Sequence, residues 1–379
     1  MIYELAKNDY EKVRSIFTEL QAYNLIIAAV IEGTSPGGIY VDDVSKPKTA
    51  FMCSVEGYYL AGYEGNATFN SGLRKLIAET IFAGDTVREG EWELDLRFLP
   101  GTWEARLEAI LEGLDRPPIK FDRRHYVCRE SKVDWKAQIP AGFSIQRVDE
   151  KLLTRPELTM PDHLINWMKI NWGSIEDFMQ KGFGFCTLHG EKVVCWCMAD
   201  CVSGDACEVG IRTHPDYRRR GLATLTVAAT VDYCLSHGFA SVGWHCDKDN
   251  LGSVGVAEKA GFEKERDYVG YSYMFDKVDH LAVTGYYAFI AKQYREAAEC
   301  YEKVFAMGDD HPHYHYHLAA RAWAALGDNE TAFRYLHQAV DEGLTDVNVI
   351  KNTKEFNPLH GTQAWQDLLA RLERKKETN

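Results

Sequence analysis

The chain has 379 residues, and at ~150 residues per domain this length predicts two or three domains. Its 43 basic and 56 acidic residues give a net charge of −13, which argues against non-specific nucleic-acid binding because that needs a basic surface. A composition that is 46% hydrophobic and 26% charged excludes a mostly disordered or collagen-like chain. The longest wholly apolar run, residues 25–31, is far shorter than the ~20 residues of a membrane-spanning helix. The first residues show no secretory signal pattern, so we expect a cytoplasmic protein with neither membrane nor nucleic-acid partners.

The first part of the chain, residues 1–135, mixes short strands and helices. Apolar runs predict strands over 28–32, 38–41, 50–54 and 58–62, and longer patterns predict helices over 69–83 and 102–114. This alternation is typical of an α/β domain, and the Asp-Arg-Pro-Pro run at 115–118 marks a break after it.

The middle part, residues 136–277, alternates more clearly. Strands are predicted over 192–198, 208–213, 241–246 and 268–275, and helices over 222–237 and 254–259. Leu225, Ala228, Val231 and Leu235 share one face of the longer helix, and Gly238 ends it. The order again predicts an α/β (α+β) domain with a mixed sheet flanked by helices.

The last part, residues 278–379, is predicted to be all-helical and contains a weak repeat. At an offset of 35 residues Ala297 aligns with Ala332 and Tyr301 with Leu336, which gives two helices the same small-then-large apolar face. This spacing resembles the tetratricopeptide repeat, whose period is ~34 residues. Only two units are evident, and a closing helix is predicted over 363–374.

Cysteine and histidine clusters suggest no metal site. The four cysteines between positions 195 and 207 lack zinc-ligand spacing, so we expect buried, free thiols that act as small hydrophobes. His313 and His317 lie one helical turn apart, but no third ligand follows at a natural spacing. We expect them to lie at the start of a helix.

The connection between the predicted strand 208–213 and the predicted helix 222–237 carries the strongest chemical signal. It contains three arginines followed by Gly221 and Ala223. Backbone N–H groups at such a helix start, together with the helix dipole, suit a pyrophosphate, and glycine permits its close approach.

Two segments resemble the acetyl-coenzyme A signature of the GNAT N-acetyltransferase superfamily. The first is His-Pro-Asp-Tyr-Arg-Arg-Arg-Gly-Leu-Ala-Thr at 214–224, and the second, at 250–262, ends in Gly-Phe as the family's second block does. With Trp244-His245-Cys246 and the long N-terminal extension, the chain looks most like the zwittermicin A-resistance type. That resemblance implies tandem GNAT-like domains, the first of them degenerate, ahead of the tetratricopeptide-like tail.

The resemblance implies acetyl-CoA as donor and places its contacts. The pyrophosphate is expected at the 218–224 loop, the pantetheine arm along the strand that precedes it, and further contacts in the second segment. The implied residues are Arg218, Arg219, Arg220, Gly221, Leu222, Ala223 and Thr224, then Ile211, Arg212 and Thr213, and finally Asn250 and Ser253.

Acetyl transfer to an amine also needs a base, since an alkylammonium is not a nucleophile. Glu208 lies where several GNAT enzymes keep a glutamate base, although a carboxylate at a strand edge could equally pair with an arginine. Asp200 and Glu176 are weaker candidates.

The general acid is less well defined. Ala257 occupies the position of the family's usual tyrosine, so either the acid comes from elsewhere or the thiolate leaves with help from water. We expect Tyr271 on the closing strand. The alternatives are Tyr268 and Tyr273 on the same strand, and His245 or Cys246.

We therefore expect an N-acetyltransferase that acts by direct attack on a primary amine of a small molecule, such as a cationic or aminopolyol antibiotic. The alternative is a catalytically weak acyl-CoA sensor or scaffold. In either case the helical tail is expected to bind a protein partner or to mediate self-association.

Overall fold

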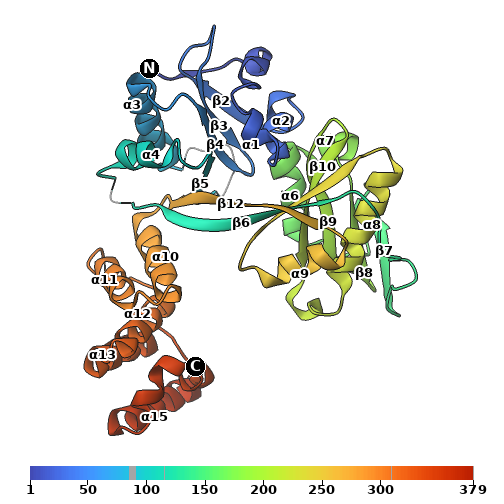
Figure 1. Cartoon of the computed structure of the whole chain (residues 1–379). Coiled ribbons are helices and arrows are strands. Elements are labelled where there is room, and N and C mark those ends of the chain that lie inside the picture. The colour runs from blue at the N-terminus through green and yellow to red at the C-terminus, as the bar shows by residue number, and fades with distance from the viewer. Residues whose placement is uncertain (85–90, 115, 309, 379) are drawn as a thin grey trace. The chain divides into compact units, whose positions relative to one another are not determined.

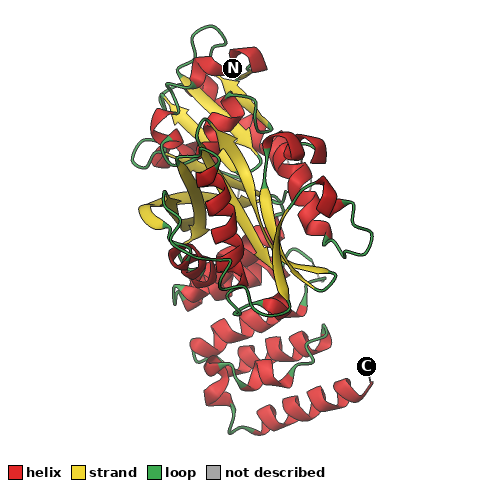
Figure 2. Ribbon diagram, turned by 90° about the vertical axis from the view of Figure 1, so that its right-hand side faces the viewer, coloured by secondary structure: helices red, strands yellow, loops and turns green. Residues whose placement is uncertain are grey.

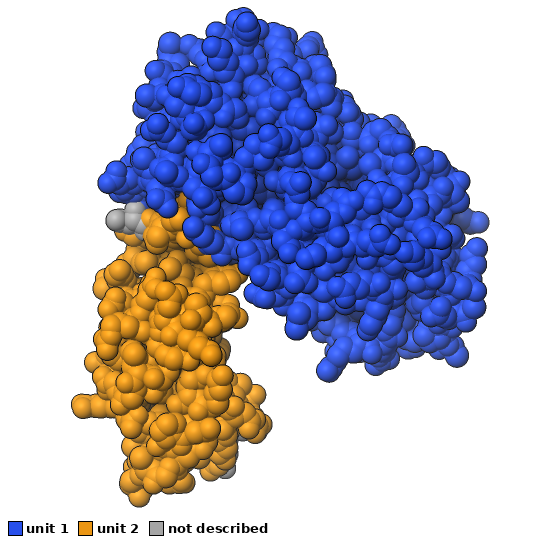
Figure 3. Space-filling view, viewed as in Figure 1, with its two compact units in different colours: residues 1–114, 120–272 blue, residues 115–119, 273–379 orange. Residues whose placement is uncertain are grey.

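A computed structural model of the chain describes residues 1–84, 91–114, 116–308 and 310–378. These residues form two compact units, one made of residues 1–114 and 120–272 and the other of 115–119 and 273–379 (Figure 3). Among the described residues, no helix has both the length and the apolar character needed to cross a membrane.

Twelve described strands form one mixed sheet, in the order β1-β2-β3-β4-β5-β12-β6-β11-β10-β9-β8-β7 (Figure 1). Their bounds are β1 Tyr3–Glu4, β2 Gly37–Val41, β3 Thr49–Ser54, β4 Gly57–Gly62, β5 Glu93–Phe98, β6 Ile119–Cys128, β7 Phe143–Arg147, β8 Gly184–His189, β9 Lys192–Ser203, β10 Ala206–Thr213, β11 Ser241–Asp247 and β12 Glu263–Met274.

Helices connect and cover these strands (Figure 2). In the first unit they are α1 Thr18–Gln21, α2 Leu25–Ile31, α3 Ala67–Leu76, α4 Glu104–Leu111, α5 Glu150–Leu153, α6 Asp162–Trp172, α7 Ile175–Lys181, α8 Leu222–Ser236 and α9 Leu251–Lys259. The second unit has its own helices, α10 Lys277–Ile290, α11 Tyr294–Phe305, α12 His313–Ala325, α13 Asn329–Asp341, α14 Val347–Lys351 and α15 Gln363–Thr378.

The sheet contains the same strand pattern twice. Strands β1 to β4 are antiparallel neighbours and β5 then pairs parallel to β4; strands β7 to β10 repeat this order, and β11 pairs parallel to β10. The final strand of each half is exchanged, since β6 lies beside β11 and β12 beside β5. Because β6 and β12 also neighbour each other, the two halves share one continuous sheet.

The parallel pair in the second half is short, and this opens the sheet at its centre. Strands β10 and β11 pair only through the three residues that end at Glu208 and Gly243. A bulge follows between Glu208 and Val209, after which β10 continues to Thr213 against β9 alone. One edge of residues 209–213 is therefore left without a strand partner in β11.

The middle elements agree with the sequence predictions, with one clear error in the first half. The strands predicted near 192, 208, 241 and 268 correspond to β9, β10, β11 and β12, and the helix predicted from 222 to 237 is α8. The strand predicted over 28–32 is wrong, because Leu25–Ile31 forms helix α2. Six of its seven residues are buried, so the run has no polar side that could have distinguished a helix from a strand.

All ten cysteines are buried and free, which confirms their interpretation as core residues. Most of them belong to the core of the second half, for example Cys197 on β9 and Cys234 on α8. There they fill small spaces among larger side chains such as Trp196 and Trp244.

The second unit is built from packed helices. The repeat positions Ala297, Tyr301, Ala332 and Leu336 are all fully buried, as the 35-residue offset predicts. Gly285 lies so close to α11 that an added Cβ would meet Cys300 at 3.0 Å, which explains the small residue there. His313 begins α12 directly after Pro312, as expected for a helix start.

Candidate functional site

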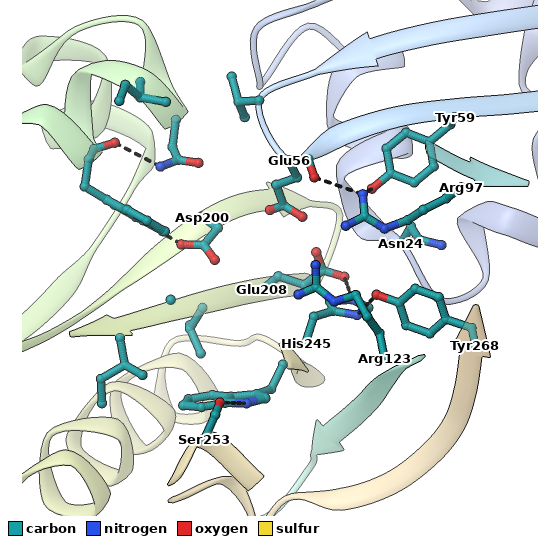
Figure 4. A pocket seen from close by; sticks show the side chains of 18 residues that line it. Asn24, Glu56, Tyr59, Arg97, Arg123, Asp200, Glu208, His245, Ser253 and Tyr268 are labelled. Atoms are coloured by element: carbon teal, nitrogen blue, oxygen red, sulfur yellow. Dashed lines mark hydrogen bonds and ion pairs between the residues drawn. The ribbon is translucent and has the colours of Figure 1, made fainter. Parts of the chain in front are cut away.

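A cavity of about 360 Å³ lies in the first unit, where the two halves of the sheet meet (Figure 4). Residues of both halves line it. The first half contributes Asn24, Val55, Glu56, Tyr59 and Arg97, and Arg123 comes from the exchanged strand β6. The second half contributes Trp167, Ile170, Asn171, Asp200, Glu208, Val209, Gly210, Ile211, Trp244, His245, Ser253 and Tyr268.

Glu208 projects from β10 at the bulge and is only 4% exposed. Its Oε1 accepts a hydrogen bond of 2.9 Å from the backbone N–H of Leu25 and lies 3.1 Å from His245 Nε2. Gly243 on the neighbouring strand leaves it space, since a Cβ there would lie 2.7 Å from Glu208 Cγ. The carboxylate is therefore fixed from both halves of the sheet.

His245 connects Glu208 to Tyr268. The Tyr268 hydroxyl lies 2.9 Å from His245 Nδ1, on the opposite side of the ring from Glu208. An ionised carboxylate only accepts hydrogen bonds, so Nε2 donates to Glu208 and Nδ1 accepts from the tyrosine. Both ring nitrogens are satisfied when the imidazole is neutral.

Burial and hydrogen bonding set the charges of this group. Burial lowers the pKa of His245 below its ordinary value, against the opposing influence of Glu208. Burial alone would raise the pKa of Glu208, but the electrostatic influence of His245 and the hydrogen bonds from His245 and Leu25 lower it overall. We therefore assign a neutral His245 beside an ionised Glu208 at neutral pH.

Asp200 on β9 is a second carboxylate of the cavity. It accepts a 3.1 Å hydrogen bond from the indole N–H of Trp167 and another from the backbone N–H of Gly210. A Cβ on Gly210 would lie 2.7 Å from Asp200 and 2.6 Å from Trp167, so only glycine admits this pair. Burial raises the pKa of Asp200 well above its ordinary value, and the charges of Glu56 and Glu208 add to the effect.

The two arginines of the cavity are already paired with acidic groups. Arg97 is 3% exposed, and its guanidinium donates to Asp95 at 2.7 Å and to the backbone carbonyl of Glu56 at 2.9 Å. Arg123 lies 3.8 Å from the same Asp95 and 3.6 Å from Asp247.

The loop before α8 has the backbone of an anion-binding turn. Arg219 and Gly221 both have positive φ, 60° and 80°, and no side chain caps the helix that begins at Leu222. A Cβ at Gly221 would meet no atom within 4 Å, so open space lies beside the turn. The side chains of Arg218, Arg219 and Arg220 are exposed around it.

Comparison with known proteins identifies the family. The family model described as GNAT acetyltransferase matches residues 14–271, which is more than half of the chain. The chain belongs to the GNAT acetyltransferase family.

Two relatives extend over the same region. The uncharacterized N-acetyltransferase YdfB of Bacillus subtilis (strain 168) is 27% identical over 273 residues, which cover 72% of this chain and 98% of the relative. A crystal structure of a GCN5-related N-acetyltransferase-like protein from Streptococcus suis 89/1591 is 22% identical and covers 70% of this chain and 98% of its own. Its TM-score of 0.51 supports a shared fold. The protein is thus an acyltransferase with a GNAT fold.

GNAT enzymes generally use acetyl-CoA, and the second half of this chain offers features that fit it. The uncapped start of α8 presents backbone N–H groups beside three exposed arginines. The equivalent connection of the first half, between β4 and α3, contains no arginine, and Asn66 there caps its own helix by accepting from Phe69 N–H at 3.0 Å. Of these two connections, the one in the second half is therefore the uncapped, arginine-rich turn.

The sequence-predicted residues fall into three places. Glu208, Ile211 and Ser253 line the cavity, and residues 218–224 form the turn and the first residues of α8. Arg212 and Thr213 lie at the end of the open edge of β10, outside the cavity lining. Asn250 caps α9 by accepting from Ser253 N–H at 3.1 Å, and Ser253 Oγ in turn accepts from Trp244.

Tyr271 is not among the residues that line this cavity. It is fully buried, its ring lies edge-on to Phe98 at 4.8 Å, and Lys120 lies over it at 5.3 Å. Tyr268, three residues earlier on β12, does line the cavity. Of the weaker base candidates, Asp200 lines the cavity and Glu176 is exposed on α7.

Sequence reasoning missed the contribution of the first half. Glu56 lies in the turn between β3 and β4, and Arg97 and Arg123 lie within strands β5 and β6. The strand that carries Arg97, Glu-Leu-Asp-Leu-Arg-Phe, alternates charged and apolar residues, and Arg97 is the charged residue that is buried in it. Such a residue must be paired when the strand is buried, and so it marks a polar site.

Proposed function

We propose that this GNAT enzyme moves the acetyl group of acetyl-CoA to a primary amine of a small molecule, bound in the cavity between the two halves. The observation that carries the proposal is the alignment along β10. The strand has an open edge beyond its bulge, leads at one end into the arginine-rich turn, and carries Glu208 at the cavity. A cofactor with a diphosphate, a linear arm and a thioester fits these features in order: the turn, the open strand edge and the cavity.

The donor contacts follow from these features. The N–H groups of residues 219–224 bind the pyrophosphate, assisted by the exposed arginine side chains including Arg218. The pantetheine arm pairs with the open edge of β10 at Ile211, Arg212 and Thr213. The end of the arm then reaches the cavity near Ser253, and Asn250 holds the α9 start that carries Ser253.

The reaction is a direct attack of the neutral amine on the thioester carbonyl. Glu208 takes the ammonium proton, directly or through water, and a backbone N–H of β10 stabilises the developing oxyanion. The C–N bond forms and the C–S bond breaks, the nitrogen gives up one of its two remaining protons, and the thiolate of CoA takes up a proton. Tyr271 was the sequence choice for that acid, but the cavity position of Tyr268 favours Tyr268.

The test is a thiol-release assay with acetyl-CoA and a panel of amines that includes polyamines, aminoglycosides and amino-polyols, run beside calorimetric titration with CoA. Tight CoA binding with thiol release on at least one amine supports the proposal. Absence of CoA binding rejects it.

One observation supports a second candidate, an acyl-CoA sensor or scaffold. Ala257 is fully buried in α9, at the position where many family members carry the tyrosine that acts as general acid. A sensor would bind CoA tightly but release no thiol with any amine of the panel, which distinguishes the two.

We also propose an organisation into a degenerate GNAT-like half (1–135), a catalytic half (136–277) and a tetratricopeptide-like tail (278–379). The repeated strand order supports the first two. The buried repeat positions support the third, and the exposed Tyr286, Tyr287 and Ile290 of α10 offer a surface for a protein partner or a second copy. Light scattering of the full chain tests self-association. If the mass is that of a monomer, binding of a partner protein is the remaining role for the tail.

A further inference from the structure

The cavity contains an acidic side chain, Asp200, whose ionised form a cationic ligand would stabilise. Asp200 receives hydrogen bonds from two neutral donors, the Trp167 indole and the Gly210 backbone N–H. In the part of the chain that the structure describes, no lysine, arginine or histidine nitrogen is recorded within 4 Å of this carboxylate. The absence of a side chain at Gly210 gives both Asp200 and Trp167 their room.

Two further carboxylates surround the same space. Glu56 enters it from the β3–β4 turn of the first half, and Glu208 from β10 of the second. Carboxylate oxygens of Glu56 and Glu208 lie within 4.8 Å of each other. Charges of the same sign this close in a buried cavity repel, and a cation between them relieves the repulsion.

The cavity provides no comparable partner for a ligand carboxylate. Its two arginines, Arg97 and Arg123, both lie against Asp95, and Arg123 also contacts Asp247. A ligand carboxylate would have to compete with Asp95 for these guanidinium groups, and it would lie beside three acidic side chains.

Part of the remaining wall is apolar. Trp167 and Ile170 of α6 and Val55 of the first half line the cavity beside the carboxylates. They fit an aliphatic or aromatic carbon skeleton attached to the charged nitrogen, and the face of an indole also attracts a cation.

We propose that the acceptor is a small organic amine that binds as a cation, with its ammonium group held by Asp200 and faced by Glu56, and that carries no carboxylate next to the amino group. The inference rests on the proposed function, because it names the acceptor class of that same site. It assigns Asp200 to binding and leaves proton removal to Glu208.

Matched pairs of amines test the class directly. Tyramine against tyrosine, and isoamylamine against leucine, differ only by the α-carboxylate, so the remaining contacts cancel. Binding of each compound is measured by calorimetry to the free protein and to its CoA complex, and turnover is measured with acetyl-CoA. We expect each amine to bind at least about tenfold more tightly than its carboxylated twin, because an unpaired buried carboxylate is strongly disfavoured.

Variants at two positions identify the residues. Asp200→Asn should raise KM for the amines by at least about tenfold with a smaller change in kcat, and Glu56→Gln should act in the same direction. Asp205→Asn, in the exposed turn between the same two strands, is the matched control and should change neither constant. CoA affinity of each variant shows whether its fold is retained.

Equal or tighter binding of the amino acids, or no binding of either member of both pairs, overturns the inference. An Asp200→Asn variant that binds CoA and amines normally overturns it as well. The proposed function, by contrast, fails if the protein does not bind CoA. The two failures can be distinguished because the amine titrations of the free protein do not depend on CoA.

Discussion

The Nε2 atom of His245 lies 3.1 Å from Oε1 of Glu208, so that a neutral histidine donates to a buried carboxylate in the cavity. The other ring nitrogen is occupied by the Tyr268 hydroxyl at 2.9 Å, and the ring stacks on His125 at 4.7 Å. These contacts fix the ring and, through it, the carboxylate. In the proposed reaction His245 is therefore a positioning residue, Glu208 is the base and Tyr268 is the acid.

Glu208→Gln should lower kcat by at least about 100-fold, because the amide cannot accept the ammonium proton. KM for acetyl-CoA should change little, since the predicted diphosphate contacts lie in the α8 turn. Steady-state thiol release measures both constants. Glu191→Gln, an exposed glutamate between β8 and β9, is the control. A variant at position 208 with near wild-type kcat would remove Glu208 from the role of base.

Tyr268→Phe and Tyr271→Phe form a pair that separates the two tyrosines of β12. The first removes the hydroxyl from the cavity and from His245 Nδ1, and we expect kcat to fall about tenfold and the pH optimum to shift. The second removes a hydroxyl from a residue that does not line the cavity, and we expect a near-normal kcat. The pH profile of kcat for both variants decides between them, and the opposite ranking would restore Tyr271 as the acid.

Patterns that repeat along the chain were predictable, and groupings made by tertiary contacts were not. Arg218 to Ala223 could be found because a pyrophosphate turn needs consecutive backbone amides, which places its signal in adjacent residues. The strand that carries Glu208 could also be predicted, because its signal likewise lies in adjacent residues. Glu56, by contrast, is separated from Asp200 by 144 positions of sequence, and only the shared sheet brings them together. No local pattern contains that pairing.

Secondary structure follows the same division. Helix α8 was predictable because Leu225, Ala228, Val231 and Leu235 recur with helical spacing and Gly238 ends the helix. Helix α2 was not, because it is surrounded by core on almost all sides and its seven apolar residues carry no period. The exchange of β6 and β12 is likewise a property of the whole sheet that single strands do not encode.

Acidification should destabilise the protein in part through His125. Burial, followed by the neighbouring His245, lowers the pKa of His125 from 6.5 to about 4. The unfolded chain therefore binds more protons than the folded one below about pH 6.5, so the free energy of unfolding falls as the pH drops from there to about 4. The depression corresponds to about 3 kcal/mol for this group.

His125→Phe isolates that contribution, because phenylalanine keeps a ring against His245 and cannot be protonated. Denaturant unfolding at a series of pH values should show a shallower loss of stability between pH 6.5 and 4 in the variant than in the wild type. His237→Gln, at an exposed histidine after α8, is the control and should follow the wild type. Parallel curves for His125→Phe and the wild type would contradict the assignment.

Gly221→Trp should abolish CoA affinity while the protein stays folded. A Cβ at this position meets no atom within 4 Å, so the indole projects into the space where the diphosphate is expected, and the positive φ of 80° adds strain to the turn. The other end of α8 supplies a matched control, since Gly238 also has a positive φ, 91°, and equally open surroundings. Gly238→Trp therefore carries the same kind of backbone strain without touching the turn. Calorimetric titration with CoA should show binding by the Gly238 variant and none by the Gly221 variant, and equal affinities would exclude the turn as the diphosphate site.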